Sequence, residues 1–253
     1  MHEYYGGRNT YGEGIGIIMT NKIKARPPGD VGNATTFNFP VRYYVVEEMV
    51  GYRHRMNDRS LLEPMLKAVR ELEAAGVLGI TTTCGFLSTF QRELSAAVSI
   101  PVFTSSLMLL PLIYEMYSRS GKVGIITANQ PDLKPEFFEA VGAEKVPVVL
   151  AGMQDQPGFR GSVTEDVPVL DFDQITEEAT GVARRLVAEN PDVRAILLEC
   201  ANLPPYARAI QLATGLPVFD FVTLTNMVYD AVRAESYPLV DLKWGKAWWR
   251  SRW

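Results

Sequence analysis

The sequence is poor in the residues that most metal sites and hydrolytic active sites use. Its 253 residues include only two histidines, His2 and His54, and two cysteines, Cys84 and Cys200. This scarcity argues against a zinc site of Cys/His type and against a Ser-His-Asp triad assembled by the fold. Two cysteines also cannot build the disulfide scaffold of a small secreted domain.

Long apolar runs and an excess of positive charge are missing as well. No window holds 18 apolar residues without a charge, and no basic patch precedes an apolar stretch near residue 1, so we expect neither a transmembrane helix nor a signal peptide. The 25 lysines and arginines stand against 29 aspartates and glutamates, a net charge of −4 that disfavours nucleic-acid binding. These absences predict a cytoplasmic protein with free thiols and no membrane or nucleic-acid partner.

Nucleotide-binding and hydrolase motifs do not occur. The sequence contains no Walker A pattern and no G-x-S-x-G elbow. The glycine-rich stretch from Gly12 to Gly16 precedes the first expected strand, whereas a dinucleotide fingerprint follows one. We therefore expect no cofactor and no metal ion.

What the sequence does contain is an alternation of short apolar runs with longer amphipathic stretches. Ser60–Glu73 begins with a capping-box spacing, and Phe172–Glu189 keeps an apolar face until Pro191. Such alternation predicts an α/β fold of mostly parallel sheet flanked by helices, whose ligands bind beyond the carboxyl ends of the strands. Shorter helices are expected at Leu107–Ser118 and Phe221–Ala234. The expected strands are Gly14–Met19, Val77–Thr83, Pro101–Thr104, Lys122–Thr127, Lys145–Val149, Arg194–Glu199 and Pro217–Phe219.

The chain also repeats itself. Cys84 lies 17 residues before Pro101 in a Pro-Val-Phe sequence, and Cys200 lies 17 residues before Pro217 in another. This spacing predicts two pseudo-symmetric, Rossmann-like halves that place both cysteines at strand ends facing one shared cleft. We expect the halves to span residues 1–120 and 121–234, followed by a tail, 235–253, that contains all four tryptophans. The tail is expected to pack on the body, where it could complete the first half, or on a neighbouring subunit.

Each cysteine closes an apolar strand and precedes an expected helix. Free N–H groups and the positive end of a helix would lower the pKa of such a thiol. Two thiols on opposite sides of a small acid could exchange protons with one carbon, one as base and one as acid, and so invert a stereocentre. The alternatives are that both cysteines are buried apolar side chains or that they form a redox disulfide.

The segments around Thr82-Thr83-Cys84-Gly85 and Leu198-Glu199-Cys200-Ala201-Asn202, together with Arg26–Thr36, resemble the aspartate/glutamate/hydantoin racemase superfamily. The resemblance covers residues 14–234. It implies two α/β halves, a cofactor-independent reaction and an acid/base pair formed by Cys84 and Cys200. It also implies that a substrate carboxylate is held by backbone amides and small polar side chains. The matching positions are Thr83, Gly85, Asn129, Ala201 and Asn202.

Other residues are candidates for substrate binding on position alone. Asn129 follows the first strand of the second half, with a turn or helix-cap role as the alternative. Thr20-Asn21 occupies the equivalent position at the end of the first strand of the first half, with the same alternative. Ser105 could bind substrate or cap the helix from Leu107. Arg26 lies in a Pro- and Gly-rich segment, 21–40, that could cover the cleft and clamp a carboxylate.

The second cysteine departs from the glutamate racemase pattern. No histidine follows Cys200, so formation of its thiolate would depend on helix ends and neighbouring dipoles. Strand alternation is expected to aim Glu199 away from the cleft, in a structural role.

These observations predict a cytoplasmic, homo-oligomeric isomerase: a racemase or epimerase of a small carboxylate, such as an amino acid, or of a hydantoin-like compound. One alternative is a cis-trans isomerase or a decarboxylase of the same superfamily. Another is a non-catalytic protein that binds a small molecule.

Overall fold

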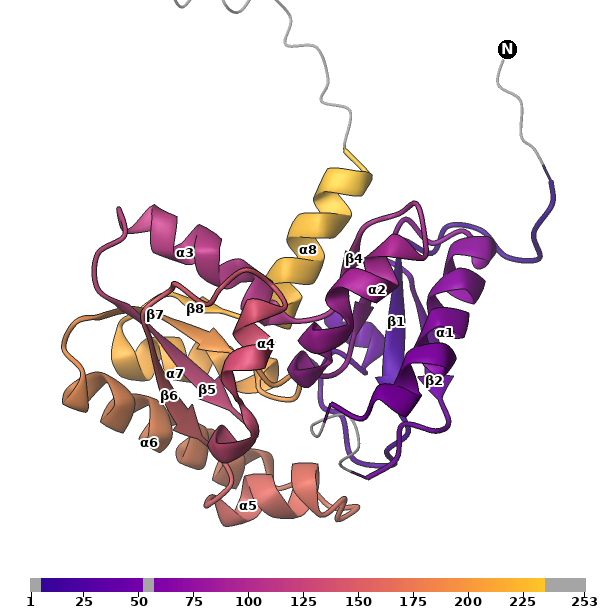
Figure 1. Cartoon of the computed structure of the whole chain (residues 1–253). Helices are drawn as coiled ribbons and strands as arrows, with labels where there is room; N and C mark the ends of the chain where they lie inside the picture. The colour runs from indigo at the N-terminus through magenta and orange to yellow at the C-terminus, as the bar shows by residue number, and fades with distance from the viewer. Residues whose placement is uncertain (1–5, 52–56, 235–253) are drawn as a thin grey trace, which may run out of the picture.

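A computed structural model describes residues 6–51 and 57–234. Figure 1 shows these residues in two lobes, each built around its own parallel sheet. The tryptophan-rich tail lies outside the described residues, so its expected packing stays a prediction. No helix in the described part of the chain combines the length and apolar character that crossing a bilayer requires.

The first sheet has the strand order β2-β1-β3-β4, with every neighbouring pair parallel. Its central strands, β1 and β3, are rich in β-branched residues and buried except for the partly exposed Met19, as expected for parallel strands covered on both faces. Helix α1 (Leu62–Ala75) buries its apolar stripe against one face of the sheet and ends at Gly76 in the left-handed conformation. The strands are β1 (Ile15–Thr20), β2 (Val41–Val46), β3 (Gly79–Thr82) and β4 (Val102–Phe103).

The second sheet repeats this design with the order β6-β5-β7-β8, again all parallel. Helix α6 (Phe172–Glu189) covers it and is capped by the side chain of Asp171. The two identical strand orders confirm the predicted fold class. The strands are β5 (Lys122–Thr127), β6 (Val148–Gly152), β7 (Val193–Leu198) and β8 (Val218–Phe219).

Two helices cross between the halves. Helix α3 (Leu110–Met116) packs against β5 of the second sheet, whereas α8 (Phe221–Val232) packs against β3 of the first. On α8, Tyr229 stacks on Phe39 with ring centroids 3.6 Å apart. Because residues of both sheets meet in one apolar cluster around these helices, the exchange joins the lobes through a shared core.

The remaining helices are short and lie mainly in the loops that follow strands. The α-helices are α2 (Gln91–Ala96), α4 (Pro135–Glu139), α5 (Pro157–Phe159) and α7 (Ala207–Thr214). Short 3-10 helices are η1 (Ala34–Thr36), η3 (Arg59–Leu61), η4 (Gly85–Phe90), η5 (Ser106–Leu109), η6 (Gln130–Asp132) and η8 (Pro204–Tyr206), and η7 (Arg160–Thr164) is a short π-helix.

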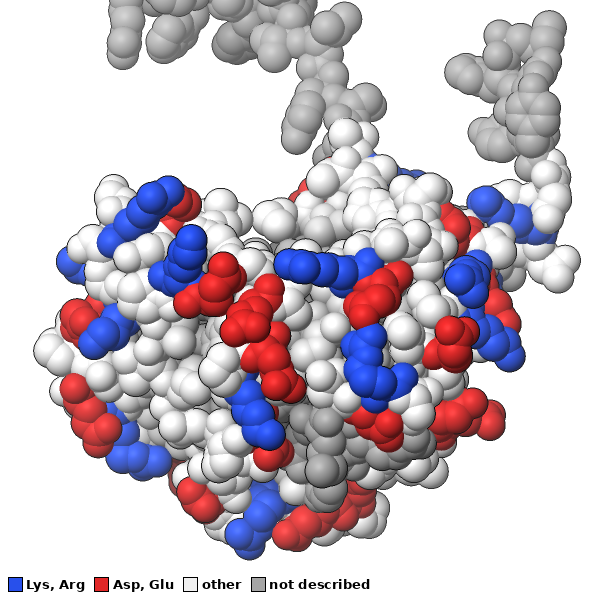
Figure 2. Space-filling view, in the orientation of Figure 1, with Lys and Arg blue, Asp and Glu red and all other residues white. Residues whose placement is uncertain are grey.

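Charge on the surface contrasts with charge in the interior. On the face shown in Figure 2, positive and negative side chains lie interspersed over both lobes. Three further cations, Lys22, Lys24 and Arg26, instead line an internal pocket. They belong to the segment 21–33, which follows β1.

Candidate active site

Cys84 and Cys200 line the same pocket, which lies between the two halves. Cys84 follows the end of β3 and Cys200 follows the end of β7, so each thiol stands at the carboxyl end of a central parallel strand. Neither cysteine forms a disulfide. The pocket is lined by Thr20, Lys22, Lys24, Arg26, Thr83, Cys84, Gly85, Phe86, Ala128, Val163, Thr164, Glu199, Cys200 and Asn202.

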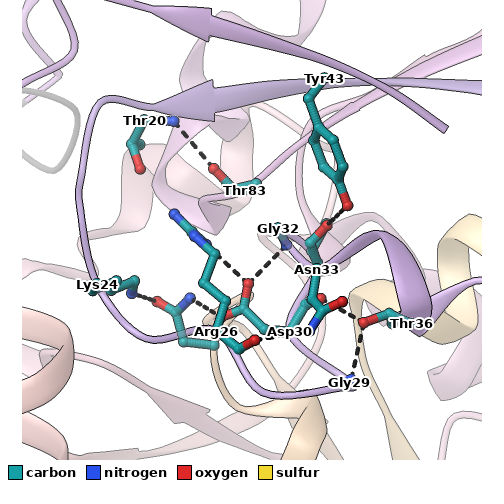
Figure 3. A network of polar contacts seen from close by, with 12 residues as sticks. Thr20, Lys24, Arg26, Gly29, Asp30, Gly32, Asn33, Thr36, Tyr43 and Thr83 are labelled. Carbon is teal, nitrogen blue, oxygen red and sulfur yellow. Dashed lines mark hydrogen bonds and ion pairs between the residues drawn. The ribbon is translucent and has the colours of Figure 1, made fainter. Parts of the chain in front are cut away.

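Five of the eight residues expected to bind substrate line this pocket: Thr20, Arg26, Thr83, Gly85 and Asn202. Thr20 and Thr83 belong to one hydrogen-bonded unit, since the Thr20 N–H donates to Oγ1 of Thr83 over 3.2 Å (Figure 3). This contact ties the end of β1 to the end of β3, beside Cys84.

The other three candidates do not line the pocket. Asn129 turns its amide to Asp132, 2.8 Å away, within the turn of η6. Ser105 is fully buried and caps η5, because its hydroxyl accepts the N–H of Leu107. Ala201 is fully buried, and its carbonyl accepts the N–H of Val31 over 3.4 Å. Each is occupied by local structure.

Sequence reasoning missed two cations of the site, Lys22 and Lys24. With Arg26 they occupy every second position after β1, and all three side chains line the pocket. The period of two was the available signal, because alternate residues of an extended segment point to the same side. Lys22 reaches the opposite half, where its Nζ lies 3.4 Å from the Val163 carbonyl and 3.3 Å from Oδ1 of Asp166.

A buried carboxylate holds the rest of this segment in place. Asp30, 2% exposed, accepts hydrogen bonds from Arg26 over 2.9 Å and from the Gly32 N–H over 2.7 Å. It also accepts one from the side-chain amide of Asn202 over 2.6 Å. Figure 3 shows Arg26, Asp30 and Lys24 converging in this network. Asp30 therefore couples the cationic segment to the loop that carries Cys200.

The backbone of the first half comes close to the second half at Gly29, which lies against Pro205. Its φ is +100°, and a methyl group added there would lie 2.7 Å from Cα of Pro205 in η8. Only glycine combines this backbone conformation with such a contact. The segment 27–33 is thus seated directly against the second half.

The cations are arranged to receive an anion. The Nη2 atom of Arg26 is buried and has no hydrogen-bond partner among the described residues. Lys24 donates to Oδ1 of Asn202 over 2.6 Å. Burial lowers the pKa of Lys24 to about 8, although the nearby Asp30 carboxylate opposes that decrease. Asp30 already balances part of this positive charge, and a ligand carboxylate could accept a hydrogen bond from the Nη2 atom of Arg26 beside Lys24.

Cys200 does not have the acidic thiol that its position at a strand end suggested. Burial, followed by the charge of Glu199, raises its pKa to about 12, and the opposing effect of Lys24 is smaller. Its sulfur lies 3.6 Å from Oδ1 of Asn202, and η8 begins only at Pro204. The expected lowering of this thiol's pKa is therefore wrong, because burial and the Glu199 charge raise the pKa instead.

Cys84 has different surroundings. It is partly exposed, and η4 begins at the next residue, with Cys84 as its N-terminal cap. The backbone N–H of Cys84 donates to Oγ1 of Thr82 over 3.3 Å, which fixes the turn out of β3. The more accessible sulfur of the pair therefore belongs to the first half.

Glu199 lines the pocket, although strand alternation was expected to aim it away. Strand β7 ends at Leu198, so the alternation does not extend to Glu199. Its side chain is fully buried, and Oε2 accepts the Thr127 hydroxyl over 2.7 Å. Gly85 leaves room for the carboxylate, since a methyl group there would lie 2.1 Å from Oε1.

Comparison with known proteins identifies the family and finds relatives that are named lyases. A family model described as Asp/Glu/Hydantoin racemase matches residues 46–226. A protein of Durusdinium sp. clade D named dimethylsulfoniopropionate lyase is 36% identical over 220 residues, covering 82% of this chain and 71% of its own. Dimethylsulfoniopropionate lyase 7 of Emiliania huxleyi (strain CCMP1516) is 35% identical over 224 residues, covering 84% and 65%.

A solved structure shares the fold. Unliganded arylmalonate decarboxylase superposes with a TM-score of 0.59 over 89% of this chain and 94% of that chain, at 15% sequence identity. This likeness supports the arrangement of two α/β halves and says nothing further about substrate.

The predicted isomerase activity is contradicted by these relatives. Proteins about one-third identical over most of the chain are named lyases, not racemases or epimerases. The unequal cysteines offer a physical reason. Inversion in both directions needs two groups that can each act as base, whereas Cys200 is held protonated by burial and by Glu199.

Proposed function

Because the chain belongs to the Asp/Glu/hydantoin racemase family, we propose that it uses the pocket shared by that family's two halves for an elimination reaction, the cleavage of dimethylsulfoniopropionate. The observation that carries the proposal is the joint placement of two thiols and three cations in one pocket of a chain 36% identical to a named dimethylsulfoniopropionate lyase. The chain spans 71% and 65% of the lengths of the two cited relatives. The activity of those longer proteins is therefore a proposal for this chain.

The reaction sets three requirements on the site. A base must remove a proton from the carbon next to the carboxylate, and the electron pair of that C–H bond becomes the new C=C bond. The C–S bond then breaks with its electrons going to sulfur, which leaves as neutral dimethyl sulfide. The products are acrylate, dimethyl sulfide and one proton, held by the base. No oxidant, reductant or second proton donor is needed.

The most difficult step is removal of the proton, because negative charge then builds on a carboxylate that is already charged. Cations fixed beside the carboxylate oxygens stabilise this charge better than water does, since they need no reorientation. The open Nη2 of Arg26 and the ammonium of Lys24 are available for this role. Arg26 is braced by Asp30, and this favours a fixed binding geometry.

We assign the base to Cys84 and a binding role to Cys200. Cys84 is the more exposed sulfur and caps a helical turn, whereas burial raises the pKa of Cys200 to about 12. The Cys200 thiol can donate to a ligand oxygen or pack against the substrate's carbon chain. An elimination needs one base only, so a pair in which burial raises the pKa of one thiol satisfies it.

Several expectations from the sequence stay proposals. We propose that the protein works in the cytoplasm as a homo-oligomer on a small carboxylate, with no nucleic-acid partner. Size-exclusion chromatography with light scattering measures the subunit number directly.

The activity is tested by incubating the purified chain with dimethylsulfoniopropionate between pH 6 and 9, with a protein-free blank at each pH. Dimethyl sulfide is measured in the headspace by gas chromatography and acrylate by liquid chromatography. We expect equal amounts of both products above the blank. Rates equal to the blank across this range would refute the proposal.

A further inference from the structure

The charges that line the pocket are divided between the two halves. Lys22, Lys24 and Arg26 come from the first half, after β1, and Glu199 comes from the second half, after β7. Asp30, the other buried carboxylate nearby, already accepts three hydrogen bonds and does not line the pocket. Glu199 is therefore the acidic side chain that the described pocket offers to a ligand.

The position of Glu199 is built into the fold. The Thr127 hydroxyl at the end of β5 fixes Oε2, and the bare Cα of Gly85 accommodates Oε1. Gly85 follows Cys84 in the chain, and Glu199 precedes Cys200, so the carboxylate lies where the loops carrying the two thiols meet. A cationic group of a ligand in the pocket would be attracted to this fixed carboxylate.

Comparison of the two halves shows that only the second has a carboxylate, that of Glu199, directly before its cysteine. The residue before Cys84 is Thr83, whose hydroxyl is used inside the first half by Thr20 and Ile18. The equivalent residue before Cys200 is Glu199. The same backbone position thus carries a neutral hydroxyl in one half and a buried carboxylate in the other, and only the second introduces a negative charge into the pocket.

We infer that Glu199 binds the positively charged onium group of a zwitterionic substrate whose carboxylate lies against Arg26 and Lys24. This inference rests on the proposed function and deepens it, because it names the substrate class as a short carboxylic acid with a permanently cationic group. Sulfonium and quaternary ammonium groups carry no N–H or O–H donor. The electrostatic contacts open to them are therefore attraction to a fixed carboxylate, such as that of Glu199, and cation–π contact with an aromatic ring, such as that of Phe86, which also lines the pocket.

The same contact assists departure of the leaving group. While the substrate is intact, its sulfonium is held by Glu199. When the C–S bond breaks, sulfur takes both electrons and becomes neutral, so its attraction to the carboxylate is lost. Acrylate keeps its negative charge, and its contacts with Arg26 and Lys24 do not depend on Glu199.

The test uses two inert ligands that have the same shape and differ in charge. 3-(Trimethylammonio)propionate and 4,4-dimethylpentanoate differ only by nitrogen or carbon at the branched centre. Binding of each to the wild type and to Glu199→Gln is measured by titration calorimetry. Glutamine keeps the size of the side chain and can still accept the Thr127 hydroxyl.

We expect the wild type to bind the ammonium compound about tenfold or more tightly than the neutral one, a difference of about 1.4 kcal/mol. In Glu199→Gln that ratio should fall to roughly threefold or less, while the affinity for 4,4-dimethylpentanoate is kept or improved. Glu199→Asp, which keeps the charge, should retain a preference for the cation. Glu177→Gln, on the exposed face of α6, is the matched control and should behave as the wild type.

A ratio that is the same in the wild type and in Glu199→Gln would overturn the inference. Because binding needs no turnover, the result is separable from the proposed function. A chain that prefers the ammonium ligand through Glu199 but releases no dimethyl sulfide would retain the inferred binding site and lose the proposed reaction. Equal thermal melting midpoints for wild type and Glu199→Gln exclude misfolding as the cause of a changed ratio.

Discussion

The two halves present the same backbone at the ends of β3 and β7 but different chemistry. The first reads Thr83-Cys84-Gly85, and the second, 116 positions later, reads Glu199-Cys200-Ala201. Cys84 is partly exposed, whereas Cys200 is buried and its pKa is raised to about 12. Duplication has kept the strand order and the place of each sulfur, and substitution of the neighbours has made the pair unequal.

Under the proposed function, this inequality suits an elimination better than a racemisation. A racemase that works in both directions needs two groups of similar basicity on opposite faces of one carbon, whereas an elimination needs one base and a place for the leaving group. The first half supplies the accessible thiol and the cations, and the second half supplies the protonated thiol and the carboxylate. Four experiments test this division of roles.

Removing each sulfur in turn should give the largest difference between the halves. Cys84→Ala should lower kcat for dimethylsulfoniopropionate cleavage by about 10²- to 10⁴-fold, the range for loss of a general base. Cys200→Ala should lower it by about tenfold or less, because that thiol does not take the proton. Steady-state release of dimethyl sulfide measures both. If Cys200→Ala were the more damaging change, the assignment of the base would have to be reversed.

The next difference concerns the residue after each cysteine. A methyl group on Gly85 would lie 2.1 Å from Oε1 and 2.5 Å from the carbonyl oxygen of Glu199, whereas Ala201 already carries one. Gly85→Ala should therefore lower the free energy of unfolding by about 1–3 kcal/mol, the usual cost of overpacking. Urea denaturation followed by circular dichroism measures this change.

Gly161→Ala serves as the control for the loss of a glycine, because a methyl group added there would lie 4.0 Å from Cγ2 of Val167. Neither Gly85 nor Gly161 has a positive φ, so the two variants differ in overpacking alone. A Gly85→Ala protein as stable as the wild type would mean that Glu199 does not rest against this glycine.

Neutralising Glu199 should lower the pKa of the Cys200 thiol. Glu199 is the second cause, after burial, of the raised pKa of Cys200. Removing its negative charge in Glu199→Gln favours the thiolate, so the pKa of Cys200 should decrease while staying above that of a free thiol. Thiolate absorbance at alkaline pH, recorded in a Cys84→Ser background, isolates this titration. An unchanged or higher pKa would show that burial alone sets it.

The smallest effect is expected from Lys24. Its pKa is about 8, so the ammonium is charged below pH 8 and neutral above it. Binding of 3-(trimethylammonio)propionate should therefore weaken several-fold between pH 7 and 9.5, because one cation beside the carboxylate is lost. Lys24→Met should bind weakly at both pH values. Calorimetry in a Cys84→Ala background keeps that sulfur from contributing, and a pH-independent affinity in the wild type would contradict the role of Lys24.

The repeated architecture could be predicted from the sequence because strands and helices leave local patterns of apolar residues. The expected helix Phe172–Glu189 and strand Lys122–Thr127 coincide with α6 and β5. Strand β2 (Val41–Val46), which follows the Pro- and Gly-rich segment 21–40, was not among the expected strands. The position of both sulfurs at strand ends followed from the repeat alone.

The electrostatics of the site could not be predicted in the same way. Lys24 meets Asn202 across 178 positions of sequence, so no local pattern brings them together. The raised pKa of Cys200 depends on burial and on the direction of the Glu199 side chain, which strand alternation mispredicted. Backbone periodicity thus located the thiols, and only tertiary structure distinguished them.

One measurement tests most directly whether a single base performs the reaction. Dimethylsulfoniopropionate carrying one deuterium on the carbon beside the carboxylate is prepared as its two mirror-image forms, and the acrylate from each is analysed by mass spectrometry. If Cys84 alone removes the proton, one form should give acrylate that keeps the deuterium, and the other should give acrylate that has lost it. Equal loss from both forms, or no acrylate at all, would contradict the account.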